Sequence, residues 1–203
     1  MLKRKSEDMI KNLKVYEKCL IVVDMVNGFV REGVLHDEKI SLVIPEQIEL
    51  IKQYNKQSEL VVFIKDTHGD DSVEFKKFGD TKHCVRGTRE AELVSELLPY
   101  EDKDNTVTIE KNSTSFMESP KFRELVSKLD NVRQYDIVGC CTDICVFNGS
   151  MGLANYMDEW NKNVEINVYQ DLIATYAEDI RHEYVEASYL LMKQQGIKLV
   201  RKK

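Results

Sequence analysis

The sequence contains no long apolar run, no signal-peptide stretch and no excess of positive charge. Its longest apolar runs, such as residues 60–64, are far too short to cross a bilayer. Residues 1–18 mix lysines and acids with scattered apolar residues, unlike a signal peptide. Lys and Arg number 29 against 35 Asp and Glu, a net charge of −6, so polyanions are poor partners. We expect a cytoplasmic protein that binds neither nucleic acid nor membrane.

Disulfide and zinc-module patterns are also missing. The five cysteines are an odd number at irregular spacing, and no two of them form a C-x-x-C pair. Such a set favours free thiols in a reducing compartment over a disulfide framework or a structural zinc module. We interpret Cys19, Cys84 and Cys140 as packed thiols.

Neither an internal repeat nor a low-complexity segment divides the chain. Its 203 residues, of which 42% are hydrophobic, fit one globular domain over residues 1–203. Residues 1–17 precede the first apolar run, and we expect them to form an N-terminal extension with a leading helix.

Six short apolar runs, rich in β-branched residues, predict strands, and the segments between them have helical spacing. The predicted strands are 20–23, 60–64, 106–109, 135–138, 164–169 and 197–200, and the predicted helices are 45–57, 119–129, 143–156 and 178–195. The first two runs are almost continuously apolar, as in strands covered on both faces. The third and fifth alternate more and are expected nearer an edge. Alternation of strand and helix predicts an α/β fold, a three-layer α/β/α domain with a doubly wound, mainly parallel six-stranded sheet.

Reactive side chains follow four of the predicted strands. Asp24 follows the first strand, Asp66 and His68 the second, Lys111 the third, and Cys145 the fourth. Ligands of an open parallel sheet bind beyond the carboxyl ends of its strands. We therefore expect these side chains to converge at one edge and to form the functional site.

Cys145 occupies a position typical of a nucleophile. It is expected in the first turn of a helix whose N-cap is Thr142 or Asp143, where free N–H groups and the helix dipole favour a thiolate. No histidine is close in sequence, so Asp24 is the candidate base, with Lys111 holding its carboxylate. Taken singly, the three could be a core cysteine, a loop cap and a solvated lysine. Their joint placement favours catalysis.

A metal site is the second candidate. Asp66 and His68 are two residues apart and would face the same side of an extended chain. His83 follows in the polar segment 66–90, which is long enough to suggest a functional loop. An Asp, His, His set leaves open positions on Zn²⁺ or Fe²⁺. The alternative, in which both histidines are simply exposed, stays open at this point.

Five segments, in order along the chain, resemble the isochorismatase-like cysteine hydrolases, and among them the nicotinamidases most. They are LIVVDMVNGF at 20–29, IKDTH at 64–68, KHCVRGT at 82–88, IEKNSTSFM at 109–117 and VGCCTDICV at 138–146. The resemblance implies a catalytic triad of Cys145, Asp24 and Lys111. It also implies a divalent metal, most often zinc, with iron or manganese as alternatives, held by Asp66, His68 and His83.

The same resemblance implies a mechanism and a substrate. A cis peptide between Cys140 and Cys141 would aim the N–H of Cys141, with that of Cys145, at an oxyanion. The expected reaction is hydrolysis of nicotinamide to nicotinic acid and ammonia through a thioester, a step of NAD salvage. Phe29 corresponds to an aromatic position beside the substrate ring.

The chain departs from the family pattern near this ring. The family has a tryptophan ahead of the residue that corresponds to His83, whereas this chain has Phe78, which we expect to substitute for it. Glu74 is a possible extra metal ligand, but we interpret it as a solvated loop carboxylate. Another small amide or carbamoyl compound is therefore the alternative substrate, and a non-catalytic binding protein with a redox-sensitive Cys145 is the alternative function. A homo-oligomer is possible.

Overall fold

A computed structural model describes residues 16–202, so the helix expected in residues 1–17 lies almost wholly outside the described residues. Six strands form one sheet in the order β3-β2-β1-β4-β5-β6. The strands are β1 Lys18–Val23, β2 Leu60–Asp66, β3 Thr106–Lys111, β4 Gln134–Cys140, β5 Glu165–Ala174 and β6 Lys198–Val200. Every pairing between neighbouring strands is parallel. The predicted doubly wound sheet is confirmed, with β3 at an edge and β5 next to the other edge.

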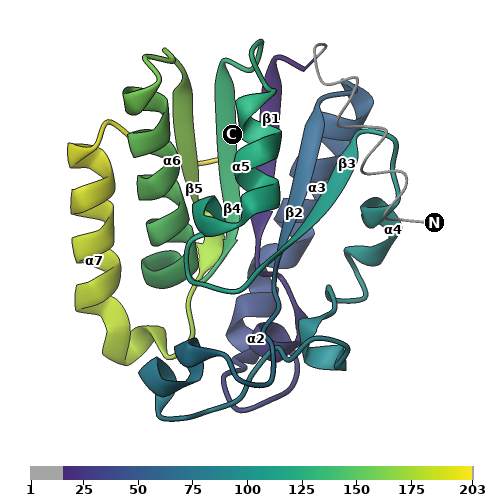
Figure 1. Ribbon diagram of the computed structural model, residues 1–203, viewed down its shortest axis with the longest axis vertical. Helices are drawn as coiled ribbons and strands as arrows, with labels where there is room; N and C mark the ends of the chain where they lie inside the picture. The colour runs from purple at the N-terminus through teal and green to yellow at the C-terminus, as the bar shows by residue number, and fades with distance from the viewer. Residues whose placement is uncertain (1–15, 203) are drawn as a thin grey trace.

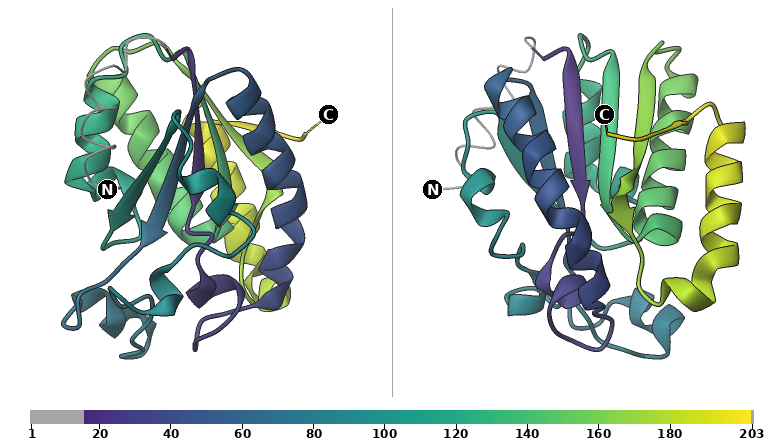
Figure 2. Two further views of the ribbon diagram at one scale, coloured as in Figure 1. Left: turned by 90° about the vertical axis from the view of Figure 1, so that its right-hand side faces the viewer. Right: turned by 180° about the vertical axis from the view of Figure 1, so that it is seen from behind.

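Helices cover both faces of the sheet (Figures 1 and 2). They are α2 Asn27–Val30, α3 Ile44–Lys56, α4 Leu98–Glu101, α5 Pro120–Ser127, α6 Phe147–Glu159 and α7 Glu178–Gln194. One core joins α5, α6 and α7 to one face, through Phe122, Leu153 and Met192. The second core joins α3 to the other face, through Leu50 and Ile51. Within residues 16–202, no helix combines the length and apolarity that a membrane span requires.

The two cores explain the continuous apolar runs of the central strands. In β1, Ile21 belongs to the core under α5 and α6, whereas its neighbours Leu20 and Val22 belong to the core under α3. Successive strand residues point to opposite faces, so a strand buried on both sides is apolar at every position.

The pairing of neighbouring strands places their carboxyl ends side by side, and the reactive residues were predicted at these ends. Val23 of β1 pairs with Ile64 of β2 and Gly139 of β4. A side chain at Gly139 would place its Cβ 2.1 Å from the Val23 carbonyl oxygen, so only glycine allows this close approach. The segments after β2 gather beyond these strand ends, at the bottom of Figure 1.

Candidate active site

The three side chains predicted to be catalytic lie together at the carboxyl edge of the sheet. Lys111 Nζ, at the end of β3, lies 2.8 Å from Asp24 Oδ2 and 3.6 Å from Cys145 Sγ. All three residues are buried. Lys111 is therefore the centre of this cluster, with the carboxylate that follows β1 and the thiol that follows β4 on either side.

Burial sets the protonation of this cluster. It raises the pKa of Asp24 to about 6, against the opposing effect of Lys111. Neither carboxylate oxygen of Asp24 accepts a hydrogen bond of ordinary geometry from the described residues. Burial also raises the pKa of Cys145 well above its ordinary value, although Lys111 lowers it. Cys145 therefore rests as a thiol, and Asp24 is a carboxylate whose pKa suits proton transfer near neutral pH.

The backbone around Cys145 differs from the prediction. Cys145 lies in a single π-helical turn, Thr142–Val146, ahead of α6, and neither Thr142 nor Asp143 is its N-cap, since Cys141 holds that position without a side-chain cap. Burial of the thiol opposes the thiolate that this position was expected to favour, and it raises the pKa of Cys145 although Lys111 lowers that pKa. A π-helical turn inside a longer helix is frequent at functional sites.

Asp143 anchors this turn instead of capping it. Its carboxylate accepts hydrogen bonds from Thr175 Oγ1 at 2.7 Å and from Arg181 Nε at 2.9 Å. Arg181 also donates to the Tyr176 hydroxyl at 3.2 Å. The start of α7 thus holds both the nucleophile turn and Tyr176. Sequence reasoning did not find Arg181, because it is one charge among many on a helix that appeared solvated.

The proposed oxyanion-binding residues lie beside the thiol. The peptide bond between Cys140 and Cys141 is cis, as the resemblance implied. Cys141 and Cys145 line the same pocket. The Cys140 thiol points away and donates to the Asp24 carbonyl at 3.1 Å, which fits its interpretation as a packed thiol.

The predicted metal ligands form a second cluster that shares Asp66 with the first. Asp66 Oδ1 lies 2.7 Å from Lys111 Nζ, and Asp66 Oδ2 lies 2.8 Å from His68 Nε2 and 3.7 Å from His83 Nε2. Burial would raise the pKa of Asp66, but Lys111 and His68 outweigh it and lower that pKa to about 2. Asp66 is therefore a carboxylate with one oxygen toward the lysine and the other toward the histidines.

Glu74 completes this cluster, contrary to the interpretation of a solvated loop carboxylate. It is 4% exposed, because the Ser72 side chain caps the 3₁₀ turn Val73–Phe78 and that turn carries Glu74 inward. Possible ligand atoms of Asp66, His68, Glu74 and His83 all lie within 4.8 Å of one another. Two imidazole nitrogens and two carboxylates fit Zn²⁺ and also Fe²⁺ or Mn²⁺. The residues present therefore fit a divalent cation.

Asn112 supports the cluster from outside. Its side-chain Oδ1 lies 2.8 Å from His68 Nδ1, which leaves His68 Nε2 facing Asp66. Partners of this kind fix the tautomer and orientation of a metal-binding imidazole. Nothing in the sequence marks Asn112 for this role except its position directly after Lys111.

The pocket between the two clusters is narrow and mostly apolar. Its lining is Phe29, Leu35, Asp66, Glu74, Phe78, His83, Thr114, Cys141, Ile144, Cys145 and Tyr176. Phe29 and Phe78, the predicted substrate contacts, flank the His83 ring at 6.1 and 5.5 Å between centroids. Leu35, Thr114, Ile144 and Tyr176 were not predicted. The cavity holds about 20 Å³, close to the space of one water molecule.

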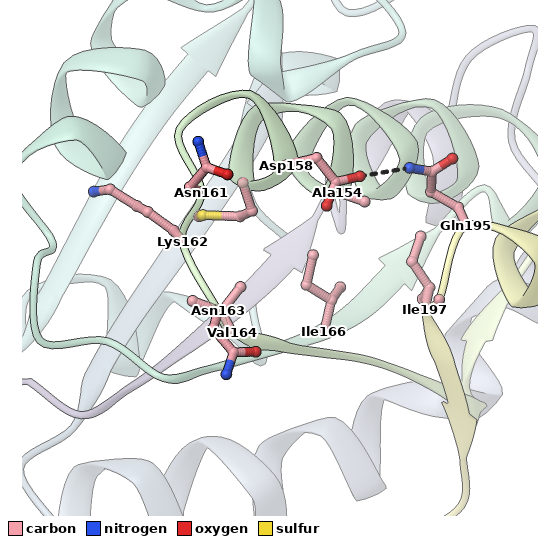
Figure 3. A pocket seen from close by; sticks show the side chains of 11 residues that line it. Ala154, Asp158, Asn161, Lys162, Asn163, Val164, Ile166, Gln195 and Ile197 are labelled. Atoms are coloured by element: carbon pink, nitrogen blue, oxygen red, sulfur yellow. Dashed lines mark hydrogen bonds between the residues drawn. The ribbon is translucent and has the colours of Figure 1, made fainter.

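A larger hollow of about 420 Å³ lies elsewhere, between the end of α6 and the loops around β5 and β6 (Figure 3). Three of its polar side chains pair with protein groups. Asp158 accepts a hydrogen bond from Gln195 at 3.0 Å, and Lys162 lies 3.3 Å from Asp130. None of the catalytic or metal-site candidates lines it. Volume alone therefore does not mark the reactive site of this protein.

Fold and site define a class: a doubly wound α/β protein with a buried cysteine, aspartate and lysine beside a candidate metal cluster. The chain belongs to the isochorismatase family, since a model of the isochorismatase domain matches residues 18–202. The family expected from the motifs is therefore confirmed.

Several relatives are similar over most of the chain. Nicotinamidase 1 of Arabidopsis thaliana is 32% identical over 141 residues, 64% of this chain and 57% of that protein, so the match spans little more than half of the relative. The pyrazinamidase of Pyrococcus horikoshii, solved in complex with zinc, is 27% identical with a TM-score of 0.73, covering 92% and 99% of the two chains. The nicotinamidase PncA of Bacillus subtilis is 25% identical with a TM-score of 0.71, covering 91% and 99%.

Removal of a proposed ligand should release metal from the purified protein. We expect His83→Ala to lose bound zinc on dialysis, and Asn112→Ala to bind it roughly 10–100-fold more weakly, as for other outer-shell partners. Metal content by mass spectrometry and zinc titration by calorimetry measure both effects. His182→Ala is the matched control, because His182 is exposed on α7. Full zinc occupancy in His83→Ala would refute the proposed ligand set.

Proposed function

We propose that the protein is an amide hydrolase that converts nicotinamide to nicotinic acid and ammonia through a thioester on Cys145. The observation that carries this proposal is Lys111, which lies within 2.8 Å of the Asp24 and Asp66 carboxylates and 3.6 Å from the thiol. Lys111 thus contacts the nucleophile Cys145, its base Asp24, and Asp66 of the candidate metal site. The isochorismatase domain and the nicotinamidase and pyrazinamidase relatives support a hydrolase acting on amide bonds.

In the proposed mechanism, Asp24 takes the proton of Cys145 as Sγ attacks the carboxamide carbon. Its pKa of about 6 leaves most of it ionised at neutral pH while it still binds a proton in the transition state. The N–H groups of Cys141 and Cys145 donate hydrogen bonds to the carbonyl oxygen and stabilise the negative charge that develops on it. Asp24 returns the proton to the leaving ammonia, then activates the water that hydrolyses the thioester.

Lys111 orients the Asp24 carboxylate. It also stabilises the negative charge as that charge moves between Asp24 and Cys145. Asp66, His68, Glu74 and His83 would hold the divalent cation. When bound, such an ion offers open coordination positions that can orient a ring nitrogen or a water. Phe29 and Phe78, whose rings flank His83, would contact the substrate ring.

We also propose that the protein works in a reducing compartment. All five cysteines are free and buried, and the thioester route requires a reduced Cys145. We therefore place the protein in the cytoplasm, acting on a small amide without nucleic-acid or membrane partners.

The test is ammonia release by the purified protein from nicotinamide, beside other small amides and carbamoyl compounds, with and without a chelator. We expect nicotinamide to have the highest kcat/KM. Faster release from a carbamoyl compound would overturn the substrate and leave the cysteine chemistry intact. Release from none of them would overturn the hydrolase.

A further inference from the structure

Tyr176 brings the segment between β5 and α7 into the pocket. Its side chain lines the same pocket as Cys141 and Cys145, and it is half-buried, packed against the core under α3. Burial raises the pKa of the Tyr176 hydroxyl although Arg181 lowers that pKa, so the phenol is neutral at neutral pH. Tyr176 is therefore a large, uncharged wall of the pocket that also contains the nucleophile.

Arg181 on α7 holds the Tyr176 side chain through two contacts. Its Nη1 donates a hydrogen bond to the Tyr176 hydroxyl at 3.2 Å, and its guanidinium carbon lies 4.8 Å from the centre of the phenol ring. A guanidinium at this distance is attracted to the face of an aromatic ring. The hydrogen bond fixes the end of the side chain and the ring contact fixes its plane, so together they hold the phenol in one orientation.

Arg181 is itself fixed by a carboxylate of the nucleophile turn. Its Nε and Nη2 both donate to Asp143 Oδ2, the former at 2.9 Å, and only 1% of the Asp143 side chain is exposed. The same carboxylate accepts a hydrogen bond at 2.7 Å from the hydroxyl of Thr175, the residue before Tyr176. Asp143 lies in the turn Thr142–Val146, so these contacts hold the Tyr176 wall at a fixed spacing from that turn.

We propose that Tyr176 is a specificity-determining residue of this pocket and that Arg181 is its positioning residue. The Tyr176 ring limits the size of an amide that can react at Cys145, because a larger group clashes with a ring that cannot turn away. Arg181 is not among the lining residues, so it acts on the substrate only through Tyr176 and the turn. The substrate class is a small amide without a bulky group on the side that faces Tyr176. The inference rests on the proposed amide hydrolysis.

Ammonia release from the best small amide and from its alkylated homologues tests the size limit. The homologues carry a methyl, ethyl or propyl group at each carbon that can bear one, and the readout is the ratio of kcat/KM values between homologue and parent. We expect Tyr176→Ala to raise this ratio roughly 10-fold or more for at least one position, the scale of size discrimination in apolar pockets. Tyr176→Phe keeps the ring and should keep the wild-type ratios.

A second half-buried tyrosine is the matched control. Tyr156 on α6 packs against the core under α5 and α6 and is not among the lining residues of the pocket, so Tyr156→Ala should keep the wild-type ratios. Unchanged ratios in Tyr176→Ala overturn the specificity role of Tyr176 alone, since ammonia release itself continues. Release from no amide at all overturns the proposed hydrolysis, and this inference with it.

Variants of Arg181 test the positioning. Lysine keeps the charge, but its single ammonium cannot replace the planar fork that bridges Asp143 and Tyr176. We expect Arg181→Lys and Arg181→Met to admit the same larger homologues as Tyr176→Ala, and Arg181→Met to shift the ratio no further once Tyr176 is alanine. Arg133→Met is the matched control, because Arg133 donates to the Asp130 carbonyl ahead of β4, away from the pocket. A loss of kcat that is equal for all homologues in both Arg181 variants would mean a structural role only and overturn the positioning.

Discussion

Cys145→Ala should abolish amide hydrolysis, lowering kcat by roughly four orders of magnitude or more, on the scale of nucleophile removal in other hydrolases. The expectation follows from the geometry, because the Cys145 thiol is the only one bonded to Lys111 among the described residues. Steady-state ammonia release with the best substrate measures the loss.

A matched thiol separates this catalytic effect from a structural one. Cys19 on β1 is also a buried free cysteine, but it belongs to the core under α5 and α6. Replacing either cysteine by alanine removes one buried sulfur and should cost about 1 kcal/mol of unfolding free energy. We expect Cys19→Ala to keep its kcat, and both variants to keep the metal. Equal activity in Cys145→Ala and Cys19→Ala would refute the thioester mechanism.

The sequence was sufficient to predict the parts of this site that follow strands. Continuous apolar runs located β1 and β2, and the rule that parallel sheets bind ligands at their carboxyl ends selected Asp24, Asp66 and Lys111. These positions depend on local pattern and a common register, which hydrophobic periodicity predicts. The motif order then linked them to Cys145.

Residues positioned by loops and by distant elements were not predicted. Glu74 is buried because Ser72 caps a 3₁₀ turn, and a polar loop sequence alone does not reveal that turn. Tyr176 and Arg181 reach the nucleophile turn only through the packing of α7 near it. Burial of Cys145 opposes the thiolate that a helix terminus favours, and the local sequence does not show this burial.

Lys111→Met should cost about 3–5 kcal/mol of unfolding free energy, besides removing activity, because breaking a buried ion pair leaves an uncompensated charge. In this case two buried carboxylates lose their partner, since Asp24 and Asp66 lie 2.8 and 2.7 Å from the same ammonium. Lys162→Met is the matched control: its 3.3 Å pair with Asp130 lies at the surface, and its loss should cost no more than about 1 kcal/mol. Urea unfolding of the chelator-treated proteins at neutral pH measures both changes.

The pH dependence of that cost distinguishes lost charge compensation from lost packing. Lys111 lowers the pKa values of both carboxyl groups, so in Lys111→Met both should be higher in the folded state than in the unfolded chain. A raised folded-state pKa means that stability lost at neutral pH returns as pH falls through that value. In wild type, the raised pKa of Asp24 has the same effect at a smaller size because Lys111 opposes it, whereas the low pKa of Asp66 contributes stability that disappears only below about pH 4. The difference in unfolding free energy between wild type and Lys111→Met should therefore narrow from pH 7 toward about pH 4. A difference that stays constant with pH would mean that Lys111 stabilises the fold by packing alone.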